Sequence, residues 1–274
     1  MQVKMSEAQL KAKTVELRKS ILTMLNAAGS GHSGGSLSSI DLLAVLYNNI
    51  MNHDPANPAM KERDRFYLSK GHVCPALYAV LADSGYFSKN ELMNLRKYGC
   101  ILQGHPCMMH TPGIEVSAGS LGQGLSIAAG TAIGAQLNKE TYRVYCLMGD
   151  GELQEGQIWE AAMTAGHFKL DNLCGIVDFN GLQIDGKVED VMDINPLRAK
   201  WEAFNWNVIE TDGHDVAKVE EAFKQAVEFK GKPTVILAHT VKGKGVSFME
   251  NSAAWHGVAP DSEQLAIALA ELKA

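Results

Sequence analysis

A glycine–aspartate–glycine turn and a downstream asparagine are the residues best suited to chemistry. The turn, Gly149-Asp150-Gly151, directly follows the apolar run YRVYCLM, and Asn180 directly follows a second run, LCGIVDF. If both runs are strands of a parallel sheet, these residues lie at its carboxyl edge, where such sheets bind ligands. The Asp150 carboxylate, the Asn180 amide oxygen and an exposed carbonyl such as that of Leu182 are hard oxygen ligands. They suit Mg²⁺ or Ca²⁺ rather than zinc.

So small a set of protein ligands leaves room for oxygens from a bound diphosphate. The glycines let the backbone approach such a ligand closely, and the helix that follows the turn offers free N–H groups at its positive end. Glycine and aspartate are also common turn formers, so the Gly149-Asp150-Gly151 triplet alone is typical of an ordinary strand-to-helix turn. Its combination with Asn180, one helix and one strand later, favours a site for a cation and a diphosphate.

The elements that position these residues alternate between strand and helix. Apolar runs predict strands, and 3.6-residue periodicity predicts helices between them. This alternation is typical of an α/β fold with a parallel sheet flanked by helices on both faces. The expected strands cover residues 142–148, 173–179, 206–211 and 233–240, and the expected helices cover 155–169, 195–205 and 215–230.

The N-terminal half predicts further helices around a strand and long loops. A capping box at Ser6 and Gln9 predicts a helix that ends at Gly29. The glycine- and serine-rich stretch GSGHSGGSLSS is expected to be a loop, with a second helix from Ser38 or Ser39 to about Asn49. The remaining expectations are a strand in FYLSKGH, helices over 75–84 and 89–98, a functional loop up to residue 124, a helix in GQGLSIAAGTAIGAQL and a terminal helix over 261–272. No linker interrupts the chain, so we expect a single domain over residues 1–274.

Composition limits the classes of function. The chain has 274 residues, 46% of them hydrophobic, and a formal net charge of −6. There is no basic stripe, which argues against nucleic-acid binding, and no run of about 18 apolar residues, which argues against a membrane span. The N-terminus lacks the features of a secretory leader, so we expect a cytoplasmic protein. The five cysteines form no CxxC pair, so their spacing does not predict a zinc site.

Several segments of the chain together resemble transketolases, which depend on thiamine diphosphate. The similar segments run in the same order from about residue 17 to residue 256 and include GSGHSGGSLSSIDLLAVLY, FYLSKGHVCPALYAVL, QGHP, TPGIE, GSLGQGLSIAAG, GDGELQEGQIWEAA, AGHFKLDNL and TVKGKGVSFMEN. The resemblance implies a diphosphate-binding domain that holds thiamine diphosphate through Mg²⁺, with Ca²⁺ or Mn²⁺ as alternatives. It also implies transfer of a two-carbon ketol unit from a ketose phosphate to an aldose phosphate.

The resemblance covers only the first of the three domains found in most transketolases. We therefore expect the pyrimidine-binding and C-terminal domains, and with them the glutamate that activates the cofactor, to lie on a separate subunit. This implies the N-terminal subunit of a split transketolase, which forms an α2β2 heterotetramer with a separately encoded C-terminal subunit and works on sugar phosphates. Two alternatives stay open: a subunit of another thiamine-dependent synthase or of a transketolase for an unusual sugar phosphate, and a non-catalytic cofactor-binding protein.

Four of the nine histidines lie in the transketolase-like loops, namely His32, His72, His105 and His256. A loop histidine alone is typical of a solvated surface, but ketol transfer moves protons near neutral pH, which suits histidine. The resemblance implies that His32 and His256 act on the donor's C3 hydroxyl. It places His105 on the two-carbon intermediate and His72 near the diphosphate. The other five histidines have no such support, and His167 and His239 are expected to be structural.

Further cofactor contacts follow from the same resemblance. It implies that Gly119 and Leu121 face the aminopyrimidine, and it adds Ile184, Glu155, His72, His256 and the Gly149–Gly151 turn to the cofactor site. Glu155 and Glu160 either complement a helix dipole or lie at an interface near the partner's glutamate.

Other positions carry open or unusual features. Lys242 and Lys244 form either a solvated turn or a lid near the diphosphate. Ser33 stands where such proteins usually have proline, which is expected to loosen the loop. Cys107 stands where an acidic residue is common, which leaves the sugar contacts of its loop open.

Overall fold

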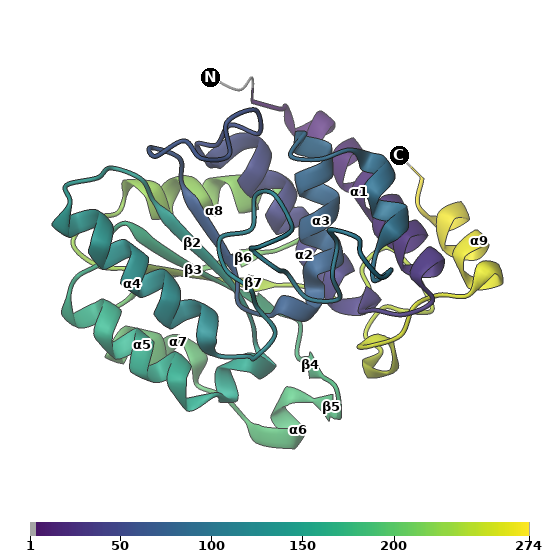
Figure 1. The fold of residues 1–274 in the computed structure, drawn as a ribbon. Helices are drawn as coiled ribbons and strands as arrows, with labels where there is room; N and C mark the ends of the chain where they lie inside the picture. The colour runs from purple at the N-terminus through teal and green to yellow at the C-terminus, as the bar shows by residue number, and fades with distance from the viewer. Residues whose placement is uncertain (1–3, 274) are drawn as a thin grey trace.

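A five-stranded, wholly parallel sheet organises the chain. The computed structural model describes residues 4–273, and its strand order is β1-β2-β3-β7-β6 (Figure 1). β7 returns between β3 and β6, so the strand order reverses beside β3, and crevices for ligands open at such points. The strands of this sheet are β1 (Arg65–Leu68), β2 (Val144–Gly149), β3 (Leu173–Phe179), β6 (Asn207–Asp212) and β7 (Thr234–His239).

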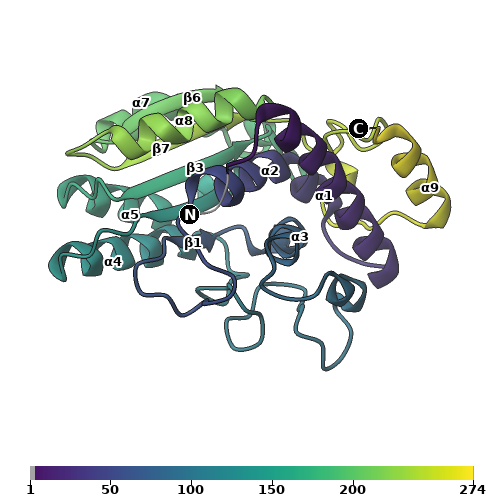
Figure 2. The same ribbon diagram turned by 90° about the horizontal axis from the view of Figure 1, so that it is seen from above.

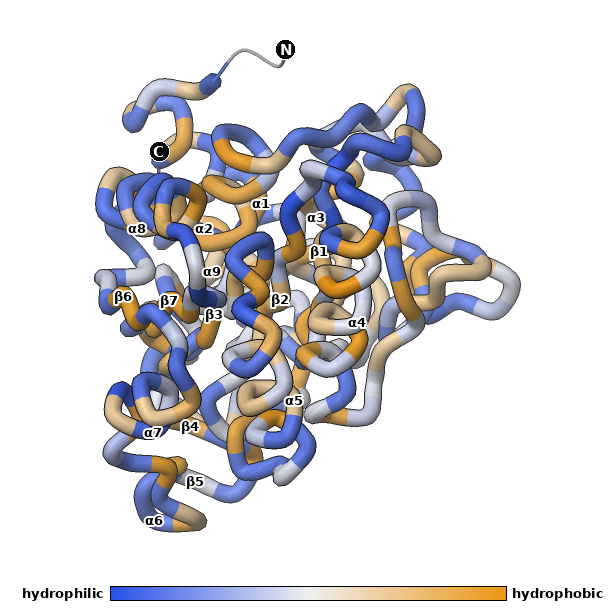
Figure 3. The backbone as a smooth tube through the Cα atoms, turned by 90° about the vertical axis from the view of Figure 1, so that its left-hand side faces the viewer, coloured by the Kyte–Doolittle hydropathy of each residue, from blue (hydrophilic) through white to orange (hydrophobic). Residues whose placement is uncertain are grey.

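Helices cover both faces of the sheet, which confirms the predicted fold class. Along β2, Tyr145 and Leu147 pack into one core with α1, α2, α3 and α8, whereas Cys146 and Met148 pack into a second core with α4, α5 and α7. Successive side chains of a strand point to opposite faces, so one buried strand supplies both cores. Figure 3 shows the strands between the helices of the two faces, with β6 at the edge of the sheet. No helix within residues 4–273 has the length and apolar character needed to cross a membrane.

The helices match most of the predicted positions. α1 starts at the expected capping box, in which Ser6 and Gln9 exchange hydrogen bonds, and ends at Gly29 in the left-handed conformation. α9 packs against α1 at one end of the molecule (Figure 2). The helices are α1 (Glu7–Ala28), α2 (Ser33–Val45), α3 (Cys74–Ser84), α4 (Gln123–Leu137), α5 (Gly156–His167), α6 (Val188–Met192), α7 (Leu197–Ala203), α8 (Val216–Glu228) and α9 (Ser262–Glu271).

The prediction that the glycine- and serine-rich stretch is a loop was wrong over its second half. α2 begins at Ser33 and continues through a π-helical turn, Leu46–Ile50. Glycine disfavours a helix, but here close packing requires it. A Cβ on Gly34 would lie 2.9 Å from Lys242 Cγ, and one on Gly35 would lie 2.7 Å from Val73 Cγ1. Tertiary packing therefore outweighs the local preference.

One further expectation failed, and one segment was not predicted. The predicted helix over 89–98 is only a 3₁₀ helix, Lys89–Asn94, because Leu95 is extended and Arg96 has a positive φ of 63°. The sequence predicts no regular structure directly after Asn180. That segment forms a two-stranded antiparallel hairpin, β4 (Leu182–Gln183) with β5 (Gly186–Lys187), followed by α6. Elements this short carry no periodicity from which they could be predicted.

Candidate active site

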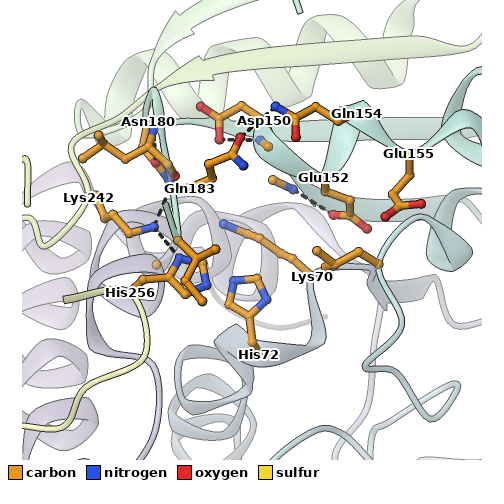
Figure 4. A pocket seen from close by; sticks show the side chains of 16 residues that line it. Lys70, His72, Asp150, Glu152, Gln154, Glu155, Asn180, Gln183, Lys242 and His256 are labelled. Carbon is orange, nitrogen blue, oxygen red and sulfur yellow. Dashed lines mark hydrogen bonds between the residues drawn. The ribbon is translucent and has the colours of Figure 1, made fainter. Parts of the chain in front are cut away.

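A cavity of 390 Å³ opens at the carboxyl edge of the sheet, where β1, β2, β3 and β7 end (Figure 4). Its wall contains most of the residues predicted to bind the cofactor. These are His72, Leu121, Gly149, Asp150, Gly151, Glu155, Asn180, Leu182, Ile184 and His256.

The three predicted metal ligands lie together in this wall. The Asp150 carboxylate accepts hydrogen bonds from the backbone N–H groups of Gly151, at 2.8 Å, and Gly181. The Asn180 Oδ1 accepts from the Leu182 N–H at 3.0 Å. The described residues contain no group of three or more His, Cys, Asp and Glu side chains that could hold a metal. A cation here would therefore depend on one carboxylate, one amide, one carbonyl and the ligand's own oxygens.

Burial changes the pKa of Asp150, the predicted carboxylate ligand. Asp150 is 2% exposed, and burial together with the nearby charge of Asp178 raises its pKa to about 6. The hydrogen bonds from Gly181 and Gly151 act in the opposite direction. A divalent cation at this point would favour the ionised form of Asp150.

The four predicted histidines form one cluster. The His32 ring lies between the other three, with centroid distances of 5.1 Å to His72, 6.2 Å to His105 and 5.6 Å to His256. His72 stacks on His256 at 5.0 Å. The four side chains come from the start of α2, the end of β1 and two long loops, so only the tertiary fold brings them together. Gly119 lies against the His105 ring.

The histidines of this cluster are uncharged near neutral pH. Burial is the main cause, and neighbouring cations add to it, lowering the pKa to about 4 for His32 and His256 and to about 2 for His72. The pKa of the more exposed His105 is also lowered. The Nδ1 atom of His32 is buried and has no hydrogen-bond partner within residues 4–273. A buried polar atom without a partner is uncommon and is typical of functional sites.

Two buried lysines, Lys70 and Lys242, line the cavity beside the carboxyl groups of Asp150, Glu152 and Glu155. Lys70 is ion-paired with Asp178, and both are buried. Lys242 forms no salt bridge within the described residues. Its Nζ contacts the Leu182 carbonyl at 3.3 Å and His256 Nδ1 at 3.2 Å. Burial and the charge of Lys70 lower its pKa to about 8. A buried cation without a carboxylate partner indicates a site for an anion.

Several site residues were missed or misjudged at the sequence level. Lys70, Glu152 and Asp178 were not singled out, although Lys70 follows a predicted strand and could have been found by its place at the carboxyl edge. Lys242 is buried in the cavity wall and is therefore not part of a solvated turn, whereas Lys244 is half-buried beside Glu250.

Four further positions singled out in the sequence differ in their burial. Ser33 is buried and donates to the Val258 carbonyl at 2.6 Å, so it ties its segment down instead of loosening it. Cys107 is half-buried at the base of a turn and accepts backbone hydrogen bonds through its carbonyl. Glu155 and Glu160 are exposed, and neither carboxylate has a hydrogen-bond partner within residues 4–273.

The remaining histidines lie away from the cluster. His239 pairs with Glu210 on the surface, and His167 packs edge-on against Phe168. His214 has a supporting role that the sequence did not reveal. Its Nδ1 lies 2.7 Å from Asp41, and its Nε2 accepts from the Val241 N–H at 2.7 Å. That contact anchors the backbone beside Lys242.

A parallel sheet whose carboxyl edge holds a cavity lined by histidines and by a lysine without a carboxylate partner defines an α/β protein suited to an anionic ligand. The family model described as "Transketolase, thiamine diphosphate binding domain" matches residues 11–272. The chain therefore belongs to the transketolase family and corresponds to its N-terminal, thiamine-diphosphate-binding domain.

Relatives of two lengths match the chain. It is 45% identical over 271 residues to the 6-deoxy-6-sulfo-D-fructose transketolase subunit of Clostridium sp. (strain MSTE9), covering 98% of each. It is 43% identical to an apulose-4-phosphate transketolase subunit of Phocaeicola vulgatus, covering 95% of that protein and 96% of this chain. The crystal structure of Campylobacter jejuni transketolase superposes with a TM-score of 0.91 at 34% identity. There the match covers 96% of this chain but only 42% of the other.

Proposed function

We propose that the chain is the N-terminal subunit of a split transketolase. Together with a C-terminal subunit it binds thiamine diphosphate and a divalent cation. The complex transfers a two-carbon ketol unit from a ketose phosphate to an aldose phosphate. The observation that carries this proposal is a single cavity whose wall contains Asp150, Asn180 and Leu182 beside the histidine cluster.

The residues of the cavity fit a diphosphate bound through a cation. A Cβ added to Gly149 would come within 3.3 Å of the Lys70 side chain, and one added to Gly151 within 3.0 Å of Gln183, so glycine keeps this cradle open. Lys70 and Lys242 would face the diphosphate, and Asp150, Asn180 and the Leu182 carbonyl would hold Mg²⁺. Thiamine diphosphate, when bound, supplies the thiazolium that stabilises a carbanion.

The histidines would handle the protons of the sugar. Both His32 and His256 are uncharged near neutral pH. In this proposal His32 acts as the base, and His256, whose Nδ1 accepts from Lys242 Nζ, donates a hydrogen bond through Nε2. We assign to them the proton of the C3 hydroxyl. The more exposed His105 would hold the hydroxyl groups of the two-carbon unit, and His72 would lie between cofactor and sugar.

The partner is inferred from the relatives of the chain and from its exposed apolar side chains. Both relatives of similar length are named as transketolase subunits, whereas this chain spans 42% of the Campylobacter jejuni protein. The packed pair α4 and α5 exposes Ile127, Leu137 and Met163, and exposed apolar side chains of this kind mark association surfaces. We propose that the partner covers this surface, forms an α2β2 complex and places its activating glutamate near Glu155.

The names of the relatives bear on the sugar substrate. The two relatives of similar length are named for 6-deoxy-6-sulfo-D-fructose and apulose-4-phosphate. This observation favours, as a second candidate, a transketolase for an unusual sugar rather than for the common pentose and hexose phosphates. Both candidates use the same cavity and the same cofactor.

An activity assay tests the proposal. Thiamine diphosphate and Mg²⁺ are added to the chain alone and to its complex with the partner subunit, and ketol transfer is measured in both. The donors include pentose and hexose phosphates, 6-deoxy-6-sulfo-D-fructose and apulose-4-phosphate. We expect activity only in the complex. Full activity of the chain alone would contradict the split-enzyme proposal, and inactivity with every donor would favour a non-catalytic protein.

The role of Asp150 gives a narrower test. Asp150→Ala removes the only carboxylate among the three proposed ligands. We expect it to abolish Mg²⁺-dependent binding of thiamine diphosphate, with a loss of affinity of at least about 100-fold. Isothermal titration calorimetry on the complex measures this, with Asp185→Ala in the nearby β4–β5 turn as the matched control. Tight, metal-dependent binding by Asp150→Ala would refute the assignment.

A further inference from the structure

Asp178 lies at the centre of a buried network beneath the proposed cation site. It is fully buried, and five side chains from four parts of the fold donate to it. Ser38 and Ser39 of α2 lie 2.6 and 3.1 Å from its Oδ2, and Asn180 Nδ2 lies 3.1 Å from the same atom. Lys70 and Thr240 complete the set through short contacts.

We propose that Asp178 is a positioning residue that orients the Asn180 amide so that its oxygen, and not its nitrogen, faces the cation. The inference rests on the proposed function and adds a residue that neither binds the cation nor touches the sugar. Asp178 cannot serve as a ligand itself, because it is fully buried and both of its oxygens are engaged by protein donors.

The two ends of the Asn180 amide are not equivalent. Asn180 presents an acceptor at one end and a donor at the other, and only its acceptor end can bind a cation. An ionised carboxylate accepts hydrogen bonds only, so Asp178 pairs with Nδ2 and leaves Oδ1 on the opposite side. That Oδ1 now accepts from the Leu182 N–H in the cavity wall. Rotating the amide by half a turn would bring Oδ1 against the carboxylate, which repels it.

The surrounding groups all present donors to Asp178. Lys70 forms a buried ion pair with it, and Ser38 and Thr240 donate hydrogen bonds to its two oxygens, so the carboxylate acts only as an acceptor. The same ion pair fixes Lys70 in the cavity wall. Side chains behind metal ligands commonly set ligand orientation in this way, and their loss typically weakens metal affinity by about 10- to 100-fold.

A binding measurement tests the proposal without relying on activity. The complex of the chain with its partner subunit is saturated with thiamine diphosphate and titrated with Mn²⁺, and free Mn²⁺ is followed by electron paramagnetic resonance. Asp178→Asn offers Asn180 a side chain that can donate as well as accept. We expect Mn²⁺ affinity to fall by at least about tenfold. Asp64→Asn, a buried carboxylate that bonds only backbone N–H groups far from the cavity, is the matched control and should bind like the wild type.

A double-mutant cycle separates orientation from loss of charge. Asn180→Asp replaces the amide by a carboxylate that faces Asp178, so this single variant should bind Mn²⁺ poorly through repulsion. In the double variant Asn180→Asp/Asp178→Asn, the side chain at position 178 can donate a hydrogen bond to the carboxylate at position 180. This restores a donor–acceptor pair, with the two roles exchanged relative to the wild type. We expect Asp178→Asn to weaken Mn²⁺ binding in the wild-type background and to strengthen it in the Asn180→Asp background. A purely structural role does not produce such a reversal of sign.

The outcomes are distinct. Failure of the wild-type complex to bind Mn²⁺ with thiamine diphosphate would overturn the proposed function. Wild-type binding together with unchanged affinity in Asp178→Asn would overturn the positioning role alone. Loss of affinity by the same factor in the wild-type and Asn180→Asp backgrounds would also overturn it. Circular dichroism melting of every variant shows that each comparison is made between folded proteins.

Discussion

Two aspartates at adjacent strand ends have opposite ionisation behaviour. Asp150 and Asp178 are both buried, yet the pKa of Asp150 is raised to about 6 and that of Asp178 is lowered to about 2. The difference comes from Lys70, which is ion-paired with Asp178 only. Neighbouring carboxyl groups with pKa values pushed apart have different tasks. We interpret Asp150 as the group reserved for an incoming cation and Asp178 as a permanently charged support.

The buried histidines predict a pH-dependent stability. The folded-state pKa of His32 is about 4, below its ordinary value of 6.5, so between these values the unfolded chain binds more protons. Its contribution to the unfolding free energy is complete above about pH 6.5 and is lost as the pH falls toward about 4. His32→Gln should therefore lose less stability than the wild type between about pH 7 and about pH 5 in urea denaturation.

The comparison isolates His32 because its charged and titratable neighbours stay in place. These are Arg96, Lys242, His72, His105 and His256. His72 and His256 contribute with the same sign, so part of the wild-type pH dependence remains in the variant. Identical pH dependence in both proteins would show that His32 is not buried in its neutral form.

Residue type determined which site residues could be predicted. Asp150, Asn180 and the loop histidines are polar residues at strand ends or in glycine-rich turns, so the sequence alone indicates them. Asp178 lies inside the apolar run LCGIVDF, and its partners Ser38 and Lys70 are 140 and 108 residues away. No local pattern encodes contacts of that separation, so the network beneath the site required the structure.

At the scale of elements, local preference predicted the longer segments and failed where tertiary contacts decide. The bounds of β3 agree with its prediction because a buried parallel strand reads as a continuous apolar run. The start of α2 was misplaced because Gly34 and Gly35 suggest a loop. There the absence of side chains admits Lys242 and Val73 at close range.

Two glycines in neighbouring helices allow a matched test of local helix preference against tertiary packing. A Cβ on Gly166 of α5 would overlap the carbonyl oxygen of Phe204, whereas one on Gly130 of α4 would meet nothing within 4 Å. We expect Gly166→Ala to lower the unfolding free energy by about 2 kcal/mol or more through overpacking. Gly130→Ala should raise it by about 0.5–1 kcal/mol, because alanine favours the helix. Urea denaturation measures both, and equal effects would contradict the packing argument.

At the scale of the whole molecule, the outer surface of α4 and α5 predicts where the partner binds. Ile127 of α4 is 38% exposed, and Ile267 of α9, at the other end of the molecule, is 46% exposed. Ile127→Glu should weaken association with the partner subunit by about 2 kcal/mol or more, since it places a charge in an apolar contact. Ile267→Glu is the matched control and should associate normally. Sedimentation velocity distinguishes them, and equal association would place the interface elsewhere.

The Asp178 network also has a kinetic consequence. Its contacts join residues more than a hundred positions apart, as in the Lys70–Asp178 and Ser38–Asp178 pairs, and contacts between distant positions delay the folding of a chain. We therefore expect the cavity to form after the rate-limiting step of folding. A ligand that binds only the completed cavity stabilises the native state but not the transition state. Such a ligand should slow unfolding and leave the folding rate unchanged. The ligand-bound protein would then stay folded longer because it unfolds rarely.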